Sequence, residues 1–245
     1  MFTVYDKRMP EEYVRSLKKA LPSSEFLPFF RKEPEVYGTI SSHPDIYFFQ
    51  LDGETAVHAP SIDAGFLGKM KDLGVHLIAG KKDPSGVYPH TALYNAVRVG
   101  KKVFLNGEHI DRTVLENVRK KNFDVLNVSQ GYTRCSALAV SDNAFVTSDR
   151  KIAEMGRKNG MQVLEILPGH VKLPGEKYGF IGGAGGLTPE GDVVLAGDPR
   201  LHPEGAEILN FIKTHSRKNV YVEALPLYDA GGLFFFGRDP IYHRG

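Results

Sequence analysis

The amino-acid sequence predicts an α/β propeller, in which five β-β-α-β units form a ring closed by pairing of the N- and C-terminal segments. Two strands joined by a tight turn precede almost every expected helix, and a further strand follows it. These returning strands recur at intervals of roughly 40 to 60 residues, a spacing typical of propellers and solenoids. A doubly wound parallel sheet is the alternative, but parallel neighbours need a long crossover instead of a tight turn.

The third unit shows the pattern most clearly. Ser148 or Asp149 is placed to cap the start of its helix, and Asn159-Gly160 to end it, because both of these last residues tolerate the left-handed conformation. Its elements are the strand 136–141, the turn Asp142-Asn143, the strand 144–147, the helix 150–158 and the strand 161–167.

The other four units have the same order of elements. The Asp52-Gly53 turn in the first unit is a strong hairpin signal. A Pro/Gly-rich insertion, 168–179, accounts for the longest interval. The expected strand, strand, helix and strand are 46–51, 55–58, 63–73 and 75–79 in the first unit; 93–99, 103–105, 112–121 (capped by Asp111) and 123–128 in the second; and 184–189, 193–196, 204–214 and 220–225 in the fourth.

The fifth unit is divided between the two ends of the chain. Its first strand is expected at 231–236, and its second strand, helix and third strand at 2–5, 10–20 and 25–30. Pairing of 231–236 with 2–5 would close the ring and leave no unpaired sheet edge. We therefore expect one domain over residues 1–245.

Composition narrows the class of protein. The 245 residues are 42% hydrophobic and 24% charged, which suits a packed globular core, and a net charge of +2 gives no indication of nucleic-acid binding. No apolar run approaches the roughly 20 residues of a membrane helix. Cys135 is the only cysteine, so no intrachain disulfide can form. We expect a cytoplasmic protein with a reduced thiol.

Aligning the units on their first hairpin turn selects the candidate site. Seven residues before the turn lie Asp45, Leu93, Cys135, Gly183 and, within one residue, Asp229 or Ala230; two residues later lie Tyr47, Asn95, Ala137, Gly185 and about Gly232. Equivalent positions of a ring converge on its axis. Asp45, Asn95, Cys135 and Asp229 are therefore expected to share a pocket, in which Gly183 and Gly231 supply space and backbone donors.

Each candidate also has a structural explanation. Cys135 is either a nucleophile, with Arg134 beside it to stabilise a thiolate, or a packed core thiol. His43 and His90 are candidates for a general acid or base, and the alternative is hydrogen bonding within loops. Asp45 and Asp229 either bind a cationic group or cap strand starts. Asn95 either orients a ligand or satisfies backbone groups at the end of a strand.

With this order of strands and helices, the sequence resembles the pentein superfamily of guanidine-modifying enzymes, which includes deiminases and amidinotransferases. The residues Gln-Gly-Tyr-Thr-Arg-Cys-Ser at 130–136 and Gly-Phe-Ile-Gly-Gly at 179–183 are similar to a bacterial branch of it. The resemblance implies a cysteine that attacks a guanidinium carbon, a histidine that moves protons, and carboxylates that hold the cation. The usual cysteine near the C-terminus is absent, because Asp229-Ala230-Gly231-Gly232 is followed by Leu233 and three phenylalanines.

Two functional hypotheses remain. In the first, the protein hydrolyses a small guanidino, amidino or amide compound through a covalent adduct on Cys135, with no cofactor and no metal. In the second, it is a non-catalytic ring that binds a small metabolite or a macromolecule, since ribosome anti-association factors resemble penteins without guanidine chemistry. We expect a small-molecule ligand at the axis and neither nucleic acid nor membrane as a partner. The oligomeric state, a homodimer included, stays open.

Overall fold

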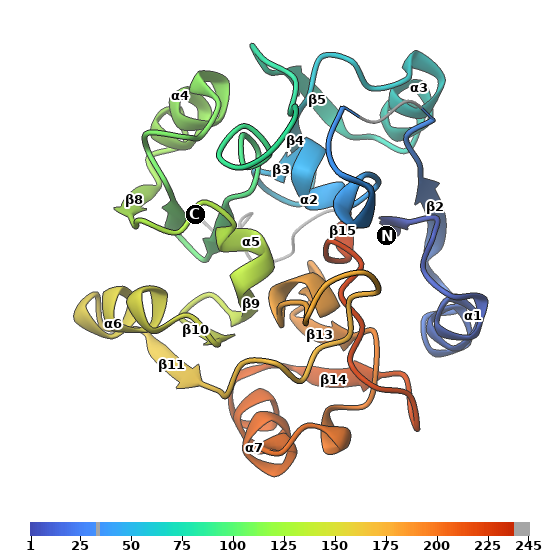
Figure 1. Cartoon of the computed structure of the whole chain (residues 1–245), viewed down its shortest axis with the longest axis vertical. Coiled ribbons are helices and arrows are strands. Elements are labelled where there is room, and N and C mark those ends of the chain that lie inside the picture. Colours follow the sequence, from blue (N-terminus) through green and yellow to red (C-terminus); the bar gives the residue numbers. More distant parts are fainter. Residues whose placement is uncertain (33–34, 238–245) are drawn as a thin grey trace.

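The computed structural model describes residues 1–32 and 35–237. These residues form a mixed α/β fold with five three-stranded sheets. In every sheet the central strand pairs antiparallel with one neighbour and parallel with the other. Figure 1 shows the five units around a common centre, with α1, α3, α4, α6 and α7 on the outside. The predicted β-β-α-β order is therefore present in all five units.

The bounds of the elements agree with the predicted ranges to within a few residues. They are β3 Phe48–Gln50, β4 Thr55–His58, α3 Ala64–Asp72 and β5 His76–Ala79 in the first unit; β6 Val97–Val99, β7 Lys102–Leu105, α4 Arg112–Lys120 and β8 Asp124–Asn127 in the second; β9 Ala137–Ser141, β10 Ala144–Thr147, α6 Arg150–Lys158 and β11 Gln162–Glu165 in the third; β12 Gly185–Leu187, β13 Asp192–Leu195, α7 Gly205–His215 and β14 Lys218–Tyr221 in the fourth; and β15 Phe234–Phe236, β1 Phe2–Asp6, α1 Glu11–Ala20 and β2 Glu25–Phe29 in the fifth.

The fifth sheet is assembled from segments that lie far apart in the sequence. β15 pairs antiparallel with β1, and Phe2 lies opposite Phe236. The rings of these two residues stack, with centroids 5.2 Å apart. β1 in turn pairs parallel with β2. The expected pairing of the segments 2–5 and 231–236 is thus present in the structure.

Aspartates begin three of the outer helices. The side chain of Asp63 accepts a hydrogen bond from the Phe66 amide at the start of α3, and Asp111 accepts one from an amide in the first turn of α4. Of the two candidates for α6, Asp149 is the cap, since its Oδ1 accepts bonds from two amides. Each cap satisfies donors that have no partner inside the helix.

The starts of the first strands differ from the prediction. A single helical turn precedes the first strand in three units, and the strands are correspondingly shorter than expected. These turns are α2 Pro44–Tyr47, α5 Thr133–Ser136 and the 3₁₀ turn Gly182–Ala184. A short apolar run does not distinguish one helical turn from a strand, because both bury consecutive residues. Asp45 and Cys135 are consequently presented from helical turns.

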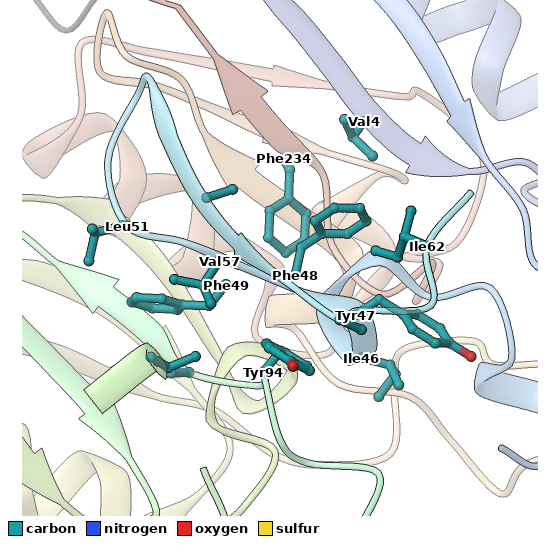
Figure 2. Packing of buried hydrophobic residues seen from close by; sticks show 14 of the residues in the cluster. Val4, Ile46, Tyr47, Phe48, Phe49, Leu51, Val57, Ile62, Tyr94 and Phe234 are labelled. Atoms are coloured by element: carbon teal, nitrogen blue, oxygen red, sulfur yellow. The ribbon is translucent and has the colours of Figure 1, made fainter. Parts of the chain in front are cut away.

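The first and fifth units share a core of aromatic side chains. Figure 2 shows Phe48 beside Phe234 of β15, and Phe49, Tyr94 of the second unit and Val4 of β1 belong to the same cluster. All of these side chains are at most 2% exposed. Full burial of a large apolar side chain contributes about 1.5–3 kcal/mol, so this cluster ties three units together. No helix among the described residues is both long and apolar enough to cross a bilayer.

Two glycines give a matched test of the packing between units. Gly74 and Gly100 both have positive φ, +90° and +60°. A Cβ atom on Gly74 would meet nothing within 4 Å, whereas one on Gly100 would overlap the carbonyl oxygen of Asp142 in the next unit. We expect Gly74→Ala to lower the free energy of unfolding by about 1 kcal/mol and Gly100→Ala by at least about twice as much, measured by urea denaturation. Equal losses would contradict this close contact between the second and third units.

Candidate functional site

Six polar side chains from four units form a buried group, here called the axial cluster. Each is at most 6% exposed, although charged and polar residues are rarely buried to this extent without a specific reason. Four of its members were selected by the register of the repeats, and His43 was a separate candidate. The members are Asp6, His43, Asp45, Asn95, Cys135 and Asp229.

The thiol of Cys135 is held by two partners. Its Sγ donates to Asp45 Oδ2 at 2.8 Å, and Asn95 Nδ2 donates to Sγ at 3.2 Å. The same Asn95 amide nitrogen also bonds the Asp45 carbonyl oxygen at 3.1 Å. Asn95 Oδ1 accepts from the backbone amides of Arg134 and Cys135. Asn95 therefore fixes α5 so that the thiol faces Asp45.

The electrostatics of this pair favour the neutral thiol. Burial raises the pKa of Cys135 well above its usual value, and the nearby Asp45 and Asp229 raise it further. Burial also raises the pKa of Asp45, an effect opposed by its bond from Cys135. Asp45 Oδ1 is buried and has no hydrogen-bond partner within the described part of the chain. An isolated buried oxygen of this kind is costly and marks a place that a donor would stabilise.

His43 lies between two carboxylates. Its Nδ1 is 3.8 Å from Asp229 Oδ1 and its Nε2 is 3.9 Å from Asp6 Oδ2, separations longer than direct hydrogen bonds. Burial, with the nearby charge of Arg8, lowers the pKa of His43 to about 3, so the imidazole is neutral at neutral pH. Burial raises the pKa of Asp229 to about 7, and the charge of Asp45 acts in the same direction.

Two glycines provide the space for this half of the cluster. A Cβ atom on Gly183 would overlap the Asp229 carboxylate, and one on Gly231 would overlap His43. Gly231 also has φ of +69°, a conformation that favours glycine. Its amide donates to Asp229 Oδ1 at 3.0 Å, and its carbonyl accepts from the Asp45 amide at 3.2 Å. Gly231 thus links the two halves of the cluster.

The guanidinium of Arg134 interacts with Cys135 through charge, so its role in stabilising a thiolate stays a prediction. The same guanidinium donates to the carbonyl oxygens of Gly182 at 2.6 Å, Gly185 at 2.9 Å and Leu233 at 3.3 Å. It also stacks over the Phe234 ring, with 5.1 Å between the guanidinium carbon and the centroid. Arg134 thereby fastens the third unit to the fourth and fifth.

His90 lies outside the axial cluster. The residue is exposed, and its backbone amide and carbonyl bond Val87 and Ser85 within the same loop. Sequence reasoning placed it close to the pocket because it precedes the first strand of the second unit. That strand begins only at Val97, so the intervening chain has room to turn outward.

Sequence reasoning missed Asp6. It ends β1, the second strand of the fifth unit, whereas the register used to select candidates compared only first strands. Arg8 holds Asp6 through paired bonds, the shortest at 2.6 Å, and also donates to the carbonyl oxygens of Gly38 and Thr39. A carboxylate at the end of a predicted strand, two residues before an arginine, was the available signal.

The His43 end of the cluster borders a hollow of about 450 Å³. Asp6, Arg8 and His43 line it together with Thr39 and Tyr228. Two loops meet at Thr39, because its Oγ1 donates to Glu176 Oε1 at 2.8 Å. Glu176 belongs to the Pro/Gly-rich insertion predicted at 168–179. Asp6 and His43 are the two members of the axial cluster that line this hollow.

Comparisons with known proteins agree with the architecture. Residues 4–234 match the model of a family of unknown function, DUF6873. In a comparison with curated proteins, nothing matches this chain.

Solved structures of similar fold span most of the chain. An amidinotransferase, SxtG of Microseira wollei, is 10% identical and covers 100% of this chain and 94% of its own (TM-score 0.51). A C. jejuni agmatine deiminase with substrate bound is 11% identical, and the match covers 91% of this chain and 87% of the deiminase chain (TM-score 0.51). DDAH from Pseudomonas aeruginosa, complexed with citrulline, is 10% identical, and the match covers 90% of this chain and 92% of the DDAH chain (TM-score 0.50). All three are penteins, which confirms the predicted resemblance at the level of fold.

Burial and the raised pKa of Cys135 lead to a first prediction for the site. We expect a thiol reagent at pH 7 to modify native Cys135 on the order of 100-fold more slowly than the same residue in denaturant, because both access and thiolate population are low. Mass spectrometry with and without urea measures the two rates. Since Cys135 is the only cysteine, the denatured sample is an internal control. Equal rates would contradict the buried, protonated thiol.

A second prediction concerns Asp229. Its pKa is higher in the folded state than in the unfolded state, so the folded protein binds more protons between about pH 4 and pH 7 and loses stability as pH rises through that range. Asp229→Asn removes this contribution. The free energy of unfolding of the variant, minus that of the wild type, should increase with pH by up to about 1.4 kcal/mol per pH unit in this window. Urea denaturation at several pH values measures it, and a difference independent of pH would contradict the assignment.

Proposed function

Because this chain belongs to the family DUF6873 and has a pentein fold, we propose that it hydrolyses a small guanidino, amidino or amide compound at the axial cluster, with Cys135 as the nucleophile. The proposal takes the five units as a closed five-bladed propeller. The observation that carries it is the 2.8 Å hydrogen bond from Cys135 Sγ to Asp45 Oδ2, which joins a thiol to a proton acceptor. A thiol paired with a base is the arrangement that covalent catalysis needs.

Charge in the cluster supports a cationic substrate. Asp6, Asp45 and Asp229 are at most 2% exposed, and Asp45 Oδ1 lacks a partner among residues 1–32 and 35–237. A planar amidinium or guanidinium matches carboxylates through paired hydrogen bonds. The positive charge would also lower the pKa of Cys135, which the two nearby carboxylates raise in the absence of ligand. The thiolate would then form in the presence of substrate.

The proposed reaction of a guanidinium has balanced steps. Cys135 gives its proton to Asp45, and the thiolate forms a bond to the guanidinium carbon. A C–N bond breaks, and the nitrogen leaves as ammonia with the proton from Asp45. Neutral His43 takes a proton from water as the water oxygen adds to the same carbon. The C–S bond then breaks to give the urea, His43 gives its proton to the Cys135 sulfur, and the proton of the added hydroxyl passes to solvent.

Substrate screening tests this function. We expect at least one compound in a panel of guanidino, amidino and amide compounds to release ammonia or urea with the wild type. Cys135→Ala should lower that rate on the order of 1,000-fold or more, and Asp45→Asn should lower it as well. Glu154→Gln, on the exposed face of α6, is the matched control and should retain the wild-type rate. Turnover that survives in Cys135→Ala would exclude the proposed nucleophile.

A non-catalytic binding ring is the second candidate, and two observations favour it. Cys135 is a buried thiol with a raised pKa in the ligand-free protein, and the segment from Asp229 to Gly232 lacks a cysteine. Calorimetry with the same panel separates the two functions. Saturable binding without release of ammonia or urea would favour the binding ring, and Asp45→Asn should weaken that binding too.

A further inference from the structure

The hollow beside His43 is lined by groups that are almost completely covered. Asp6 and His43 belong to its lining, yet each is at most 3% exposed. A side chain with so little exposed surface cannot offer its polar atoms to a bound molecule. A ligand that reaches the axial cluster through this hollow, whether it is hydrolysed or only bound, therefore needs one wall of the hollow to move.

Two walls of this hollow are held firmly. Arg8 bonds both carboxylate oxygens of Asp6 and the carbonyl oxygen of Gly38, so the end of β1 is fastened to the 3₁₀ turn Gly38–Ile40. Met9 is 4% exposed and belongs to a hydrophobic core cluster, against which Tyr228 packs. Moving either wall would break charge-assisted hydrogen bonds or core packing, and the loss of either is costly.

The third wall is a short loop, residues 173–178, here called the strap. Its first two residues line the hollow. Its two ends lie close together, because the Gly179 amide donates to the Val171 carbonyl oxygen at 2.8 Å. A surface loop with such a closed neck is an Ω-loop. Residues 174–177, at its tip, are all exposed, and the strap contributes no residue to the hydrophobic core clusters of the described chain.

One side-chain hydrogen bond joins the strap to another part of the described chain. Glu176 Oε1 accepts it from Thr39 Oγ1 at 2.8 Å, in an exposed position. The neck is held by the backbone, since Lys172 donates to the Leu227 carbonyl at 2.7 Å and accepts from the Asp229 amide at 2.9 Å. An exposed hydrogen bond contributes little to stability, and a loop with few buried apolar contacts opens locally at low free energy. The strap is therefore the wall that moves most readily.

We propose that the strap is a lid over the axial cluster, which opens when the bond between Thr39 and Glu176 breaks while its neck stays in place. Opening uncovers Asp6 and His43, because these two side chains line the hollow that the strap borders. The lid controls the access of a ligand in either candidate function. This proposal therefore does not depend on whether Cys135 is a nucleophile.

Acylation of His43 by diethyl pyrocarbonate measures the opening of the lid. The reagent attacks a neutral imidazole, and the lowered pKa of His43 keeps it in that form at pH 7. Mass spectrometry follows each histidine separately, so the exposed His90 is an internal reference. In the wild type, His43 should react on the order of 100-fold more slowly than His90, because the reagent reaches it only in the open state.

Variants of the latch test the cause. Thr39→Val removes the donor and should accelerate acylation of His43 about three- to tenfold, with His90 unchanged. Glu176→Gln is the matched control, because its amide oxygen still accepts the bond, and its rate should stay within about twofold of that of the wild type. An unchanged rate at His43 in Thr39→Val would overturn the proposal.

A disulfide across the latch tests the closed state. A Cβ atom on Gly175 would lie 2.6 Å from Thr39 Cγ2, so cysteines at these two positions bring their Cβ atoms close to the roughly 3.8 Å of a disulfide. In Thr39→Cys/Gly175→Cys, oxidation should slow acylation of His43 at least about tenfold relative to the same variant after reduction and removal of the reductant, with His90 unchanged. Equal rates at His43 in the oxidised and reduced forms would show that another wall moves, and would overturn the proposal.

Discussion

Space at the axis is the constraint on which the structure depends. Side chains from four units meet in the axial cluster, and two of them fit there only because a glycine lies against them. Gly183 leaves room for the Asp229 carboxylate, and Gly231 leaves room for His43. Arg134 then fastens the arrangement, because its guanidinium bonds carbonyl oxygens of the fourth and fifth units. The positions of the polar side chains therefore depend on how closely the backbones of neighbouring units pack.

Removal from water dominates the chemistry of the axial cluster. Burial raises the pKa values of Cys135, Asp45 and Asp229 and lowers that of His43, so each group is driven toward its neutral form. Hydrogen bonds to Asp45 and Asp229 offset only part of this cost. A bound cation would shift these groups from their neutral to their ionised forms, since its positive charge stabilises the carboxylates and the thiolate together. The same residues would thus have different protonation states with and without a bound cation.

Repeat register was the most informative property of the sequence. It brought together Asp45, Asn95, Cys135 and Asp229, because equivalent positions of these units lie close together whatever their local conformation. The comparison of repeats failed where the position of a residue in its unit does not determine the direction of its loop or side chain. His90 precedes the expected first strand of the second unit, yet its loop turns outward. Asp6 lies on a second strand that the alignment did not compare. The direction of the Arg134 side chain depends on carbonyl groups of distant units, which a local pattern does not contain.

The two glycine pockets have an evolutionary consequence. Gly183 and Asp229 come from different units, as do Gly231 and His43, and each pair occupies a single volume. A methyl group gained at Gly183 is compatible with the fold only after the Asp229 side chain has become smaller, whereas one at Gly231 would also meet the Cα and Cβ atoms of His43. Substitutions at Gly183 and Asp229 are therefore epistatic, and the order in which they arise is restricted. Divergence of one unit after duplication is in this way limited by residues that lie dozens of positions away in the chain.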